Sequence, residues 1–325
     1  MKAITQDRYG PAEVLELRDV PRPTIKDDEV LIEVRAAGVD PGVWHLMTGK
    51  PYMIRAMGFG MKRPKVPVRG RDVAGVVAEV GTRVTRFSAG DEVYGTSESG
   101  SFAEYATAPE KQVSRKPTNT SFEQAAVTPV SGTTALQAVR DSGAVAAGQR
   151  VLVIGAAGGV GAFAVQIAKS LGARVTGVCS TAKLDLVRSL GADDVVDYTR
   201  HNIGDDGARY DVIIDTAGNR GLSLLRRAMT PKGTLVLVGG EHGGGPLLGG
   251  FDRQLRAPIA SLLVGQQLKA LVAKERAEDL AVLTRLIESG EVTPLVGRTY
   301  ALAEAAEAVG YVAAGHARGK VALTI

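Results

Sequence analysis

A glycine-rich turn between an apolar strand and a helix constrains the fold of this 325-residue chain more than any other feature. Residues 151–161 read VLVIGAAGGVG, and a helical pattern follows from Val160 to Leu171. Glycines at such a turn let backbone N–H groups approach a pyrophosphate, and the helix N-terminus attracts its negative charge. The sequence therefore predicts a dinucleotide site. The residues expected to contact the dinucleotide are Gly155, Gly158, Gly159, Val160 and Gly161.

The sequence on either side of this turn follows two different patterns. From Phe122 onwards, apolar runs at 150–154, 174–179 and 234–238 alternate with helical segments. This alternation predicts an α/β fold with a parallel, doubly wound sheet. Before Phe122 the strands are short and punctuated by glycine, as at 90–95, which indicates a barrel-like or sandwich-like β module.

The residues after the second strand of the parallel sheet bear on the choice of dinucleotide. An acidic side chain there, ~20 residues after the glycines, would bind the ribose 2′-hydroxyl of NAD. Residues 179–183 read CSTAK, and no acid occurs before Asp185. Hydroxyl groups and a lysine suit a 2′-phosphate, because they donate hydrogen bonds and neutralise its charge. The sequence therefore favours NADP(H) with Ser180, Thr181 and Lys183 as ligands; an exposed first-turn lysine is the alternative for Lys183.

Two more glycine turns follow strands of the same sheet. They are DTAG at 215–218 and VGG at 238–240. Because ligands bind at the C-terminal edge of a doubly wound sheet, we expect both turns to border the cofactor. The residues concerned are Ala217, Gly218, Gly239 and Gly240.

The composition excludes several other classes of protein. The single cysteine, Cys179, excludes a disulfide framework and a zinc site built from several thiolates. The net charge of +4 is too small and too dispersed to indicate nucleic-acid binding. The N-terminus lacks the apolar core of a signal peptide and no run of ~18 apolar residues occurs, so we expect no membrane partner and a cytoplasmic location.

One stretch departs from this dispersed charge. Residues 50–71 contain seven basic side chains and no acidic one. The stretch is either a solvated surface loop or a rim that attracts an anionic cofactor or substrate. Its basic residues are Lys50, Arg55, Lys62, Arg63, Lys65, Arg69 and Arg71.

Several ordered motifs together resemble the medium-chain dehydrogenases/reductases, in their zinc-independent quinone oxidoreductase-like branch. The resemblance covers nearly the whole chain. Besides the glycine-rich turn, it rests on DEVLIEVRAAGV at 28–39, GRDVAG at 70–75, GDEVYG at 90–95, GTTAL at 132–136 and GKV at 319–321.

The resemblance implies a Rossmann domain inserted in a GroES-like β-barrel domain. The corresponding boundaries are residues 1–122 and 276–325 for the GroES-like domain and 123–275 for the Rossmann domain. It also implies a homodimer formed by edge-to-edge pairing of the last Rossmann strand, here 268–272.

The resemblance adds cofactor ligands. Lys183 and Tyr198 match the pair that grips the 2′-phosphate of NADPH in this family, with Ser180 in a supporting position. Thr134 matches a threonine near the cofactor phosphates and nicotinamide. Lys320, within the C-terminal motif, is expected at the cofactor as well.

The departures from the family pattern predict that no metal is bound. Zinc alcohol dehydrogenases use cysteine and histidine where this chain has Asp40 and Arg71, and their third ligand falls near Thr128. Such zinc sites need three or four ligands at fixed geometry. Asp40 and Arg71 are instead expected to form an ion pair, which is either part of the active site or purely structural.

Two more side chains are candidates for the catalytic centre with Asp40. His45 stands where zinc alcohol dehydrogenases have a proton-relay histidine, and it is either a proton donor or a structural residue beside Trp44. Tyr52 matches a tyrosine of the quinone pocket, or is an ordinary half-buried aromatic residue. Residues 51–61 are either a methionine-rich lid over an apolar substrate or a loop that covers the core.

These features predict a metal-free, NADPH-dependent oxidoreductase that transfers a hydride to a quinone or a conjugated, α,β-unsaturated carbonyl. The alternatives are a carbonyl reductase of the alcohol/aldehyde dehydrogenase type and a non-catalytic NADPH-binding sensor. Nucleic-acid binding through residues 50–71 is a more distant alternative.

Overall fold

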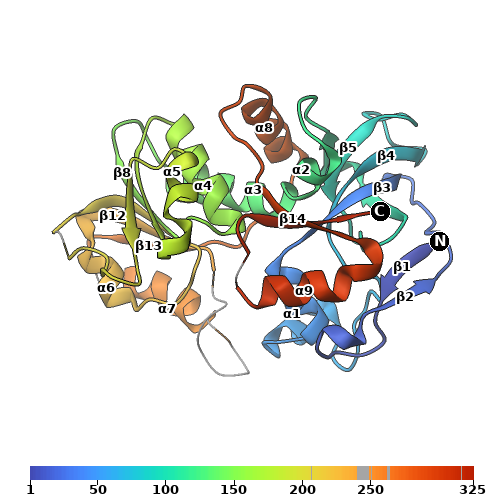
Figure 1. The fold of residues 1–325 in the computed structure, drawn as a ribbon, viewed down its shortest axis with the longest axis horizontal. Coiled ribbons are helices and arrows are strands. Elements are labelled where there is room, and N and C mark those ends of the chain that lie inside the picture. The colour runs from blue at the N-terminus through green and yellow to red at the C-terminus, as the bar shows by residue number, and fades with distance from the viewer. Residues whose placement is uncertain (206, 240–248, 250, 262–263, 316) are drawn as a thin grey trace. The chain divides into compact units, whose positions relative to one another are not determined.

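The computed structural model describes the chain except for residues 206, 240–248, 250, 262–263 and 316. It divides into two compact units (Figure 1). The first unit comprises Met1–Thr133, Glu275–Gly290 and Pro294–Ile325, and the second comprises Thr134–Lys274 and Glu291–Thr293. Residues 123–133 therefore belong to the first unit.

The first unit is built on a mainly antiparallel sheet. Its longest strand, β3 (Glu29–Val39), pairs with β4 (Asp72–Val80), β6 (Tyr105–Pro109) and β15 (Lys320–Thr324). The alternating apolar side chains of β3 are buried, as β-branched residues on a pleated surface favour. Within the described residues the order along the sheet is β14-β15-β3-β4-β5-β7. The other strands of this unit are β1 (Lys2–Thr5), β2 (Glu16–Asp19), β5 (Glu92–Thr96), β7 (Val113–Arg115) and β14 (Val296–Ala301).

Helices of the first unit follow directly from local sequence signals. Asp40 caps α1 (Pro41–Thr48), which has proline at its first position and glycine just after its end. Ser121 caps α2 (Phe122–Ala126) in a reciprocal capping box with Gln124. The remaining helices are α8 (Ala277–Glu288) and α9 (Ala305–Ala313), with short turns of helix at Ala12–Val14, Arg55–Phe59, Glu110–Gln112 and Leu302–Glu304.

The second unit has a parallel sheet with the strand order β10-β9-β8-β11-β12-β13 among its described residues. Its strands are β8 (Arg150–Ile154), β9 (Arg174–Cys179), β10 (Asp194–Asp197), β11 (Tyr210–Asp215), β12 (Met229–Leu237) and β13 (Gln267–Ala270). The helices are α4 (Gly159–Ser170), α5 (Leu184–Ser189), α6 (Leu222–Arg227) and α7 (Phe251–Ser261). The helix α3 (Pro129–Leu136) leads into this unit and continues as a π-helical turn, Gln137–Ser142; a further short turn covers Thr181–Lys183.

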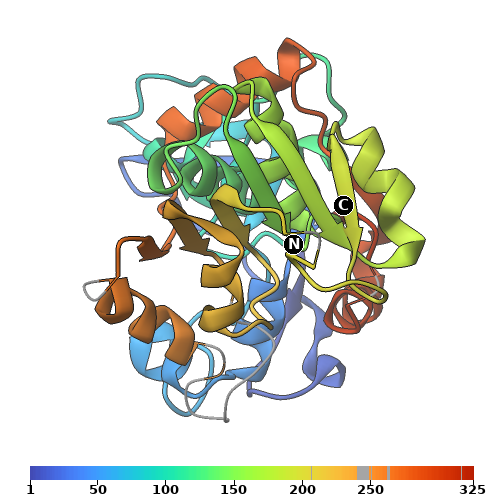
Figure 2. The same ribbon diagram turned by 90° about the vertical axis from the view of Figure 1, so that its left-hand side faces the viewer.

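The predicted doubly wound sheet is confirmed by this topology. From β8 the chain builds outward to β9 and β10, and then returns to β11 and builds outward in the opposite direction. Right-handed crossovers then place α4 and α5 on one face and α6 and α7 on the other (Figure 2). The point where the order reverses lies between β8 and β11, and ligands bind at such a point at the C-terminal strand ends.

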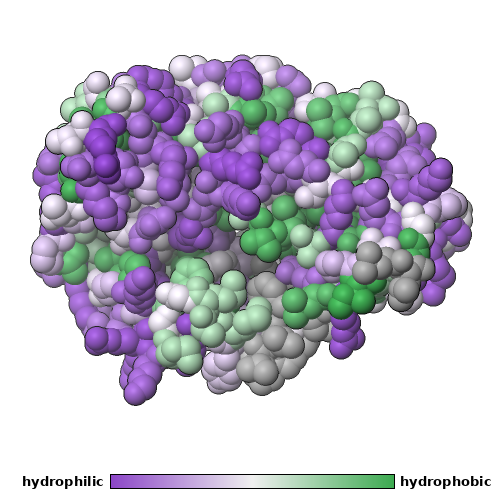
Figure 3. Space-filling view, turned by 180° about the vertical axis from the view of Figure 1, so that it is seen from behind, coloured by the Kyte–Doolittle hydropathy of each residue, from purple (hydrophilic) through white to green (hydrophobic). Residues whose placement is uncertain are grey.

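The surface in Figure 3 is mainly hydrophilic, with several separate hydrophobic patches. Large exposed apolar side chains cluster in sequence at two places. One group lies in the first unit (Tyr52, Met57, Phe59 and Met61) and the other in the second (Leu255, Ile259 and Val272). Among the described residues, no helix has the length and apolar character needed to cross a membrane.

Candidate cofactor and substrate sites

The glycine-rich turn after β8 is shaped by contacts that only glycine allows. Gly155 has a φ of +81°, and a Cβ on Gly161 would lie 2.1 Å from the Gly155 carbonyl oxygen. Gly158 is the N-cap of the twelve-residue helix α4. The first N–H groups of α4, at Gly159 and Val160, have no carbonyl one turn earlier in the helix. The turn therefore presents donors and the positive end of a helix dipole, which fits a dinucleotide pyrophosphate.

The turn after β11 contacts this glycine-rich turn, and the turn after β12 contacts the turn after β11. A Cβ on Gly155 would lie 2.5 Å from the Thr216 hydroxyl oxygen, and one on Gly239 would lie 2.2 Å from the Thr216 carbonyl oxygen. Gly218 has a φ of +69° and donates its N–H to Asp215. The structure thus brings together Gly155, Ala217, Gly218 and Gly239 at one edge of the sheet. Gly240 lies outside the described residues.

The candidates for the 2′-phosphate site also lie at this edge. The Tyr198 N–H donates to the Cys179 carbonyl at 3.1 Å, so Tyr198 lies beside the segment that starts at Ser180. The Tyr198 ring is 52% exposed. Ser180 and Lys183 are half-buried, while Thr181 is exposed and donates its hydroxyl to Asp197.

Asp197 is an acid at this site that sequence reasoning did not identify. It ends β10, directly opposite Cys179, and is buried. Its carboxylate accepts hydrogen bonds from the Thr181 hydroxyl and from the Thr199 hydroxyl and N–H, and these bonds lower its pKa, the one from Thr181 most. Because both its oxygens are engaged within the protein, Asp197 does not replace the missing ribose-binding acid.

Two arginines at the same edge were also missed by the sequence analysis. The Arg220 guanidinium lies 5.7 Å from the centre of the Tyr198 ring, and burial lowers its pKa. Arg253 forms a 2.7 Å ion pair with Asp215, while its Nε and Nη1 are buried without hydrogen-bond partners. The positive charge of Arg220 adds to that of Lys183 around Tyr198. A pattern search misses these residues because each reaches the edge from a different loop or helix.

Two of the predicted cofactor ligands have less direct support. Thr134 is half-buried within α3. Lys320 belongs to the first unit, where its side chain is only 5% exposed and its Nζ lies 3.7 Å from the Asp72 carboxylate. Lys320 is thus the ionic partner of Asp72 in this structure, and its contact with the cofactor stays a prediction.

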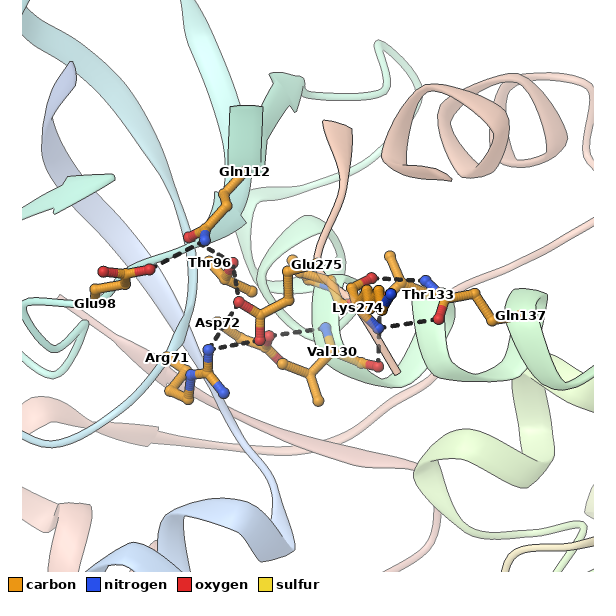
Figure 4. A network of polar contacts seen from close by, with 11 residues as sticks. Arg71, Asp72, Thr96, Glu98, Gln112, Val130, Thr133, Gln137, Lys274 and Glu275 are labelled. Carbon is orange, nitrogen blue, oxygen red and sulfur yellow. Dashed lines mark hydrogen bonds and ion pairs between the residues drawn. The ribbon is translucent and has the colours of Figure 1, made fainter. Parts of the chain in front are cut away.

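Asp40 and Arg71 do not form the predicted ion pair. Asp40 is buried and its Oδ1 accepts the Gly42 N–H at 2.7 Å, while its Oδ2 has no hydrogen-bond partner. Arg71 instead pairs with Glu275 at 2.6 Å, and the Thr96 hydroxyl donates to the same carboxylate (Figure 4). Glu275 lies 204 residues further along the chain, so its proximity has no local sequence signal.

Asp72 is the most buried acid of this cluster. It accepts the Val130 N–H at 2.9 Å (Figure 4). Its ionic partner is Lys320, whose Nζ lies 3.7 Å from the carboxylate. Burial raises the pKa of Asp72 to about 7, against the opposing effect of Lys320, and the nearby charge of Asp40 raises it further. The carboxyl group is therefore in an environment that favours its neutral form.

The residues at the positions of the zinc ligands in zinc alcohol dehydrogenases do not fit a zinc ion. Asp40 caps a helix, Arg71 is a cation, and the buried Thr128 donates its hydroxyl to the Gln124 carbonyl at 2.8 Å. Among the described residues, no three His, Cys, Asp or Glu side chains form a group that could hold a metal. We therefore derive no chemistry through zinc.

His45 and Tyr52 lie at the end of α1 and just beyond it. The His45 Nδ1 is 2.7 Å from the Lys50 carbonyl oxygen, so this nitrogen carries the hydrogen and donates, and the ring lies edge-on to Trp44. Tyr52 is 44% exposed. The Arg55 guanidinium lies 4.8 Å from the Tyr52 ring and 4.2 Å from the Tyr9 ring. Tyr52 is exposed and His45 is half-buried, so Tyr52 is the more accessible of the two candidates.

Residues 51–61 are attached to the rest of the first unit at both ends. Arg55 donates to the Gly49 carbonyl, and the Tyr9 hydroxyl lies 2.6 Å from the Gly60 carbonyl oxygen. Between these attachments, Met57 and the neighbouring Phe59 are exposed. The segment is thus an anchored, apolar surface loop.

The first unit contains a pocket of about 330 Å³ between α1, residues 58–71 and the loop after β5. Its apolar walls are Val43, Leu46, Phe59, Val66 and Val68. Lys65, Arg69 and Arg71 also line it, together with Ser97 and Glu98. Within the described residues, Asp40, His45 and Tyr52 are not part of this lining. The pocket is sized for a small aromatic or branched molecule.

Two models of known protein families match the chain. Residues 26–118 match the alcohol dehydrogenase GroES-like domain, and residues 190–323 match the zinc-binding dehydrogenase domain. The first match confirms the GroES-like nature of the N-terminal β module.

Relatives that are named for their activity match nearly the full length of the chain. The chain is 35% identical over 339 residues to an NADPH-dependent alkenal/one oxidoreductase, chloroplastic, of Arabidopsis thaliana, covering 99% of this chain and 78% of the relative. It is 33% identical over 320 residues to quinone oxidoreductase of Homo sapiens, covering 95% of this chain and 92% of the relative.

A solved structure has the same fold. The quinone oxidoreductase from Coxiella burnetii superposes with a TM-score of 0.86 and 28% identity, over 100% of this chain and 99% of that one. The architecture of both units is therefore shared with an enzyme of known structure.

Proposed function

We infer the function of this chain from its family: it belongs to the medium-chain dehydrogenase/reductase superfamily, in the quinone oxidoreductase-like branch. It is an NADPH-dependent oxidoreductase that transfers a hydride to a quinone or an α,β-unsaturated carbonyl compound. The observation that carries this conclusion is the glycine cradle at the start of α4, where a Cβ on Gly161 would lie 2.1 Å from the Gly155 carbonyl oxygen. That cradle fits a dinucleotide such as the NADPH on which the Arabidopsis thaliana relative is named as dependent.

The second unit holds the cofactor in this proposal. The N–H groups at Gly159, Val160 and Gly161 bind the pyrophosphate, and the turns at Ala217, Gly218 and Gly239 border it. Thr134 contributes from α3. When bound, NADPH supplies the hydride, so this unit needs only to hold and orient it.

The preference for NADPH rests on the charge around Tyr198. Lys183 and Arg220 provide positive charge at this edge of the sheet, and Ser180 provides a hydroxyl group. The hydroxyl of Thr181 donates to Asp197, so in this proposal Thr181 offers its backbone N–H to a 2′-phosphate. A 2′-phosphate gains charge-assisted hydrogen bonds at such a site, whereas a ribose hydroxyl finds no acidic partner.

The first unit binds the acceptor in this proposal. Its pocket offers apolar walls and basic groups, which suit an apolar molecule with an electron-rich oxygen. Tyr52 lies outside the lining of this pocket, and in this proposal its exposed side chain contacts a part of the acceptor that extends beyond the pocket. Asp40 then positions the start of α1, because it accepts the Gly42 N–H. His45 positions the loop after α1 through its hydrogen bond to the Lys50 carbonyl.

We also propose that two copies assemble through β13. Among the residues that the structure describes, this strand is the last of the sheet of the second unit, and Val272 just beyond it is 79% exposed. Leu255 and Ile259 on α7, which packs beside β13, are exposed as well. An edge strand beside apolar side chains suits pairing with a second copy.

We also propose that the chain is located in the cytoplasm. Its single cysteine is buried and free, which is compatible with a reducing compartment.

The test of the proposed function is the initial rate of NADPH oxidation with quinones, enones, saturated ketones and aldehydes. A chelator is present throughout, and NADH is measured in parallel. The expected result is turnover on quinones or enones, unaffected by the chelator and faster with NADPH. NADPH binding without turnover on any acceptor would favour the sensor, and turnover that the chelator abolishes would favour a zinc alcohol dehydrogenase.

A further inference from the structure

Arg69 is a buried arginine for which the protein supplies no counter-ion. The residue is only 6% exposed, and its Nε is buried without a hydrogen-bond partner. Its Nη1 makes one long contact, 3.4 Å, to the Leu46 carbonyl oxygen. Among the residues that the structure describes, no acidic side chain forms an ion pair with Arg69.

The groups around Arg69 do not neutralise it. Burial lowers its pKa to about 10, so it remains a cation at neutral pH. The titratable group that interacts with it is the hydroxyl of Tyr9, whose own pKa burial raises above its ordinary value. The nearby cation Arg55 is engaged between the Tyr9 and Tyr52 rings. An uncompensated buried charge is costly, which makes a bound anion the natural partner.

Arg69 lines the pocket of the first unit, and the other charges there leave it available. Arg71 is neutralised by Glu275 at 2.6 Å. Glu98 is exposed and accepts a hydrogen bond from Gln112 (Figure 4). Lys65 is exposed at the same pocket. The deepest charge in the pocket is therefore an unpaired guanidinium beside apolar walls.

We propose that Arg69 binds a carboxylate on the acceptor, so that the preferred substrate is an unsaturated carbonyl compound with an apolar body and a carboxylate group. The apolar body contacts walls such as Val43, Leu46 and Phe59. The planar guanidinium matches a carboxylate through two parallel N–H donors, and Lys65 attracts it from the pocket entrance. This proposal rests on the proposed function, because it names the class of acceptor for the same reaction.

The test compares two acceptors with the same aromatic enone, one with a free carboxylate and one with that carboxylate masked as a methyl ester. Trans-benzoylacrylate has an aromatic enone and a carboxylate, and its methyl ester lacks the charge. The variants are Arg69→Met, which keeps the volume, and Arg69→Lys, which keeps the charge but loses the planar pair of donors. Arg83→Met removes one charge from the exposed surface of the same unit and serves as the control.

We expect the wild type to have a higher kcat/KM for the acid than for the ester. Arg69→Met lowers kcat/KM for the acid by about 10- to 100-fold and leaves that for the ester nearly unchanged. Arg69→Lys gives an intermediate loss, and Arg83→Met preserves the ratio of the two acceptors. An equal loss for acid and ester in Arg69→Met, or a wild type that prefers the ester, would overturn the proposal.

Direct binding separates this proposal from the proposed function. Benzoylpropionate, the saturated form of the acid, needs no turnover and is titrated into wild type and Arg69→Met by calorimetry. If neither acceptor is reduced but benzoylpropionate binds more tightly to the wild type, the proposed function fails and the carboxylate site stands. If the acceptors are reduced and benzoylpropionate binds both proteins equally, the carboxylate site fails. Arg69→Met is expected to fold, since it removes a buried unpaired charge.

Discussion

At the scale of single residues, the choice between NADPH and NADH depends on side chains that surround Tyr198. Lys183 was recognisable in the sequence, because it follows the second strand where an acid would select NAD. Arg220 was not, because it reaches Tyr198 from another segment, and neither was Asp197, because its position opposite Cys179 depends on the pairing of β10 with β9. The structure thus strengthens the argument for NADPH with residues that spacing alone does not identify.

Replacing Lys183 by alanine should therefore weaken the use of NADPH but not of NADH. Loss of a charged donor to a 2′-phosphate is expected to raise the KM for NADPH about tenfold or more. NADH lacks that phosphate, so its KM should stay within the error of the wild-type value. Steady-state kinetics with both cofactors check this, with Lys232→Ala as a control on an exposed lysine of the same unit. Equal effects on the two cofactors would remove Lys183 from the 2′-phosphate site.

The buried carboxyl group of Asp72 should make stability depend on pH. Burial raises its pKa in the folded state to about 7, whereas an unfolded chain has a value near 3.9. Between pH values of about 4 and about 7, Asp72 is therefore protonated in the folded chain and ionised in the unfolded chain. The free energy of unfolding consequently decreases as the pH rises from about 4 to about 7.

The variant Asp72→Asn has no such proton to lose. The Tm of the wild type minus that of Asp72→Asn is therefore expected to fall as pH rises across this window, as thermal denaturation at several pH values can show. A difference that grows with pH would mean that Lys320 keeps Asp72 ionised.

At the scale of elements, the close approach of α4 to the turn after β8 explains why this turn needs glycine. Gly161→Ala would place a carbon 2.1 Å from the Gly155 carbonyl oxygen, so α4 must shift away from the turn. We expect NADPH affinity to fall about tenfold or more, since the helix N-terminus no longer faces the pyrophosphate. The quenching of tryptophan fluorescence or calorimetry measures this affinity.

Gly310 in α9 provides the matched control. A Cβ there would meet no atom within 4 Å, and its φ is not left-handed. Gly310→Ala should leave NADPH affinity unchanged and stabilise the chain by about 0.5–1 kcal/mol, because glycine is unfavourable within a helix. Denaturant unfolding measures that gain, and loss of NADPH affinity in both variants would point to a general effect of the substitution.

Element types were more predictable from sequence than element boundaries and long-range contacts. The apolar runs at β8, β9 and β12 predicted strands that the structure contains, because continuous burial leaves a clear pattern. Residues 135–144 have a helical pattern in the sequence, whereas in the structure the helix begins earlier, at Pro129, and becomes π-helical after Leu136. The Arg71–Glu275 pair joins segments 204 residues apart, and no local pattern encodes such a contact.

At the scale of the whole molecule, the proposed dimer depends on the edge strand β13. Leu271 donates its N–H to the Leu237 carbonyl at 2.9 Å. Because neighbouring residues of a strand point their N–H groups in opposite directions, the N–H of Ala270 faces the open edge. Ala270→Pro removes that donor without removing a bond to β12, and proline is tolerated at a strand edge.

The wild type is therefore expected to sediment with the mass of two 33.9 kDa chains, and Ala270→Pro with the mass of one. NADPH affinity and the circular dichroism spectrum should be unchanged, since β12 keeps its pairing and the glycine cradle lies at other strands. A wild type that sediments as a single chain would rule out this dimer. If Ala270→Pro stays dimeric and the outward-facing N–H groups of β13 exchange their hydrogens rapidly in the wild type, the interface lies elsewhere. The exposed Leu255 and Ile259 of α7 are then the next residues to substitute.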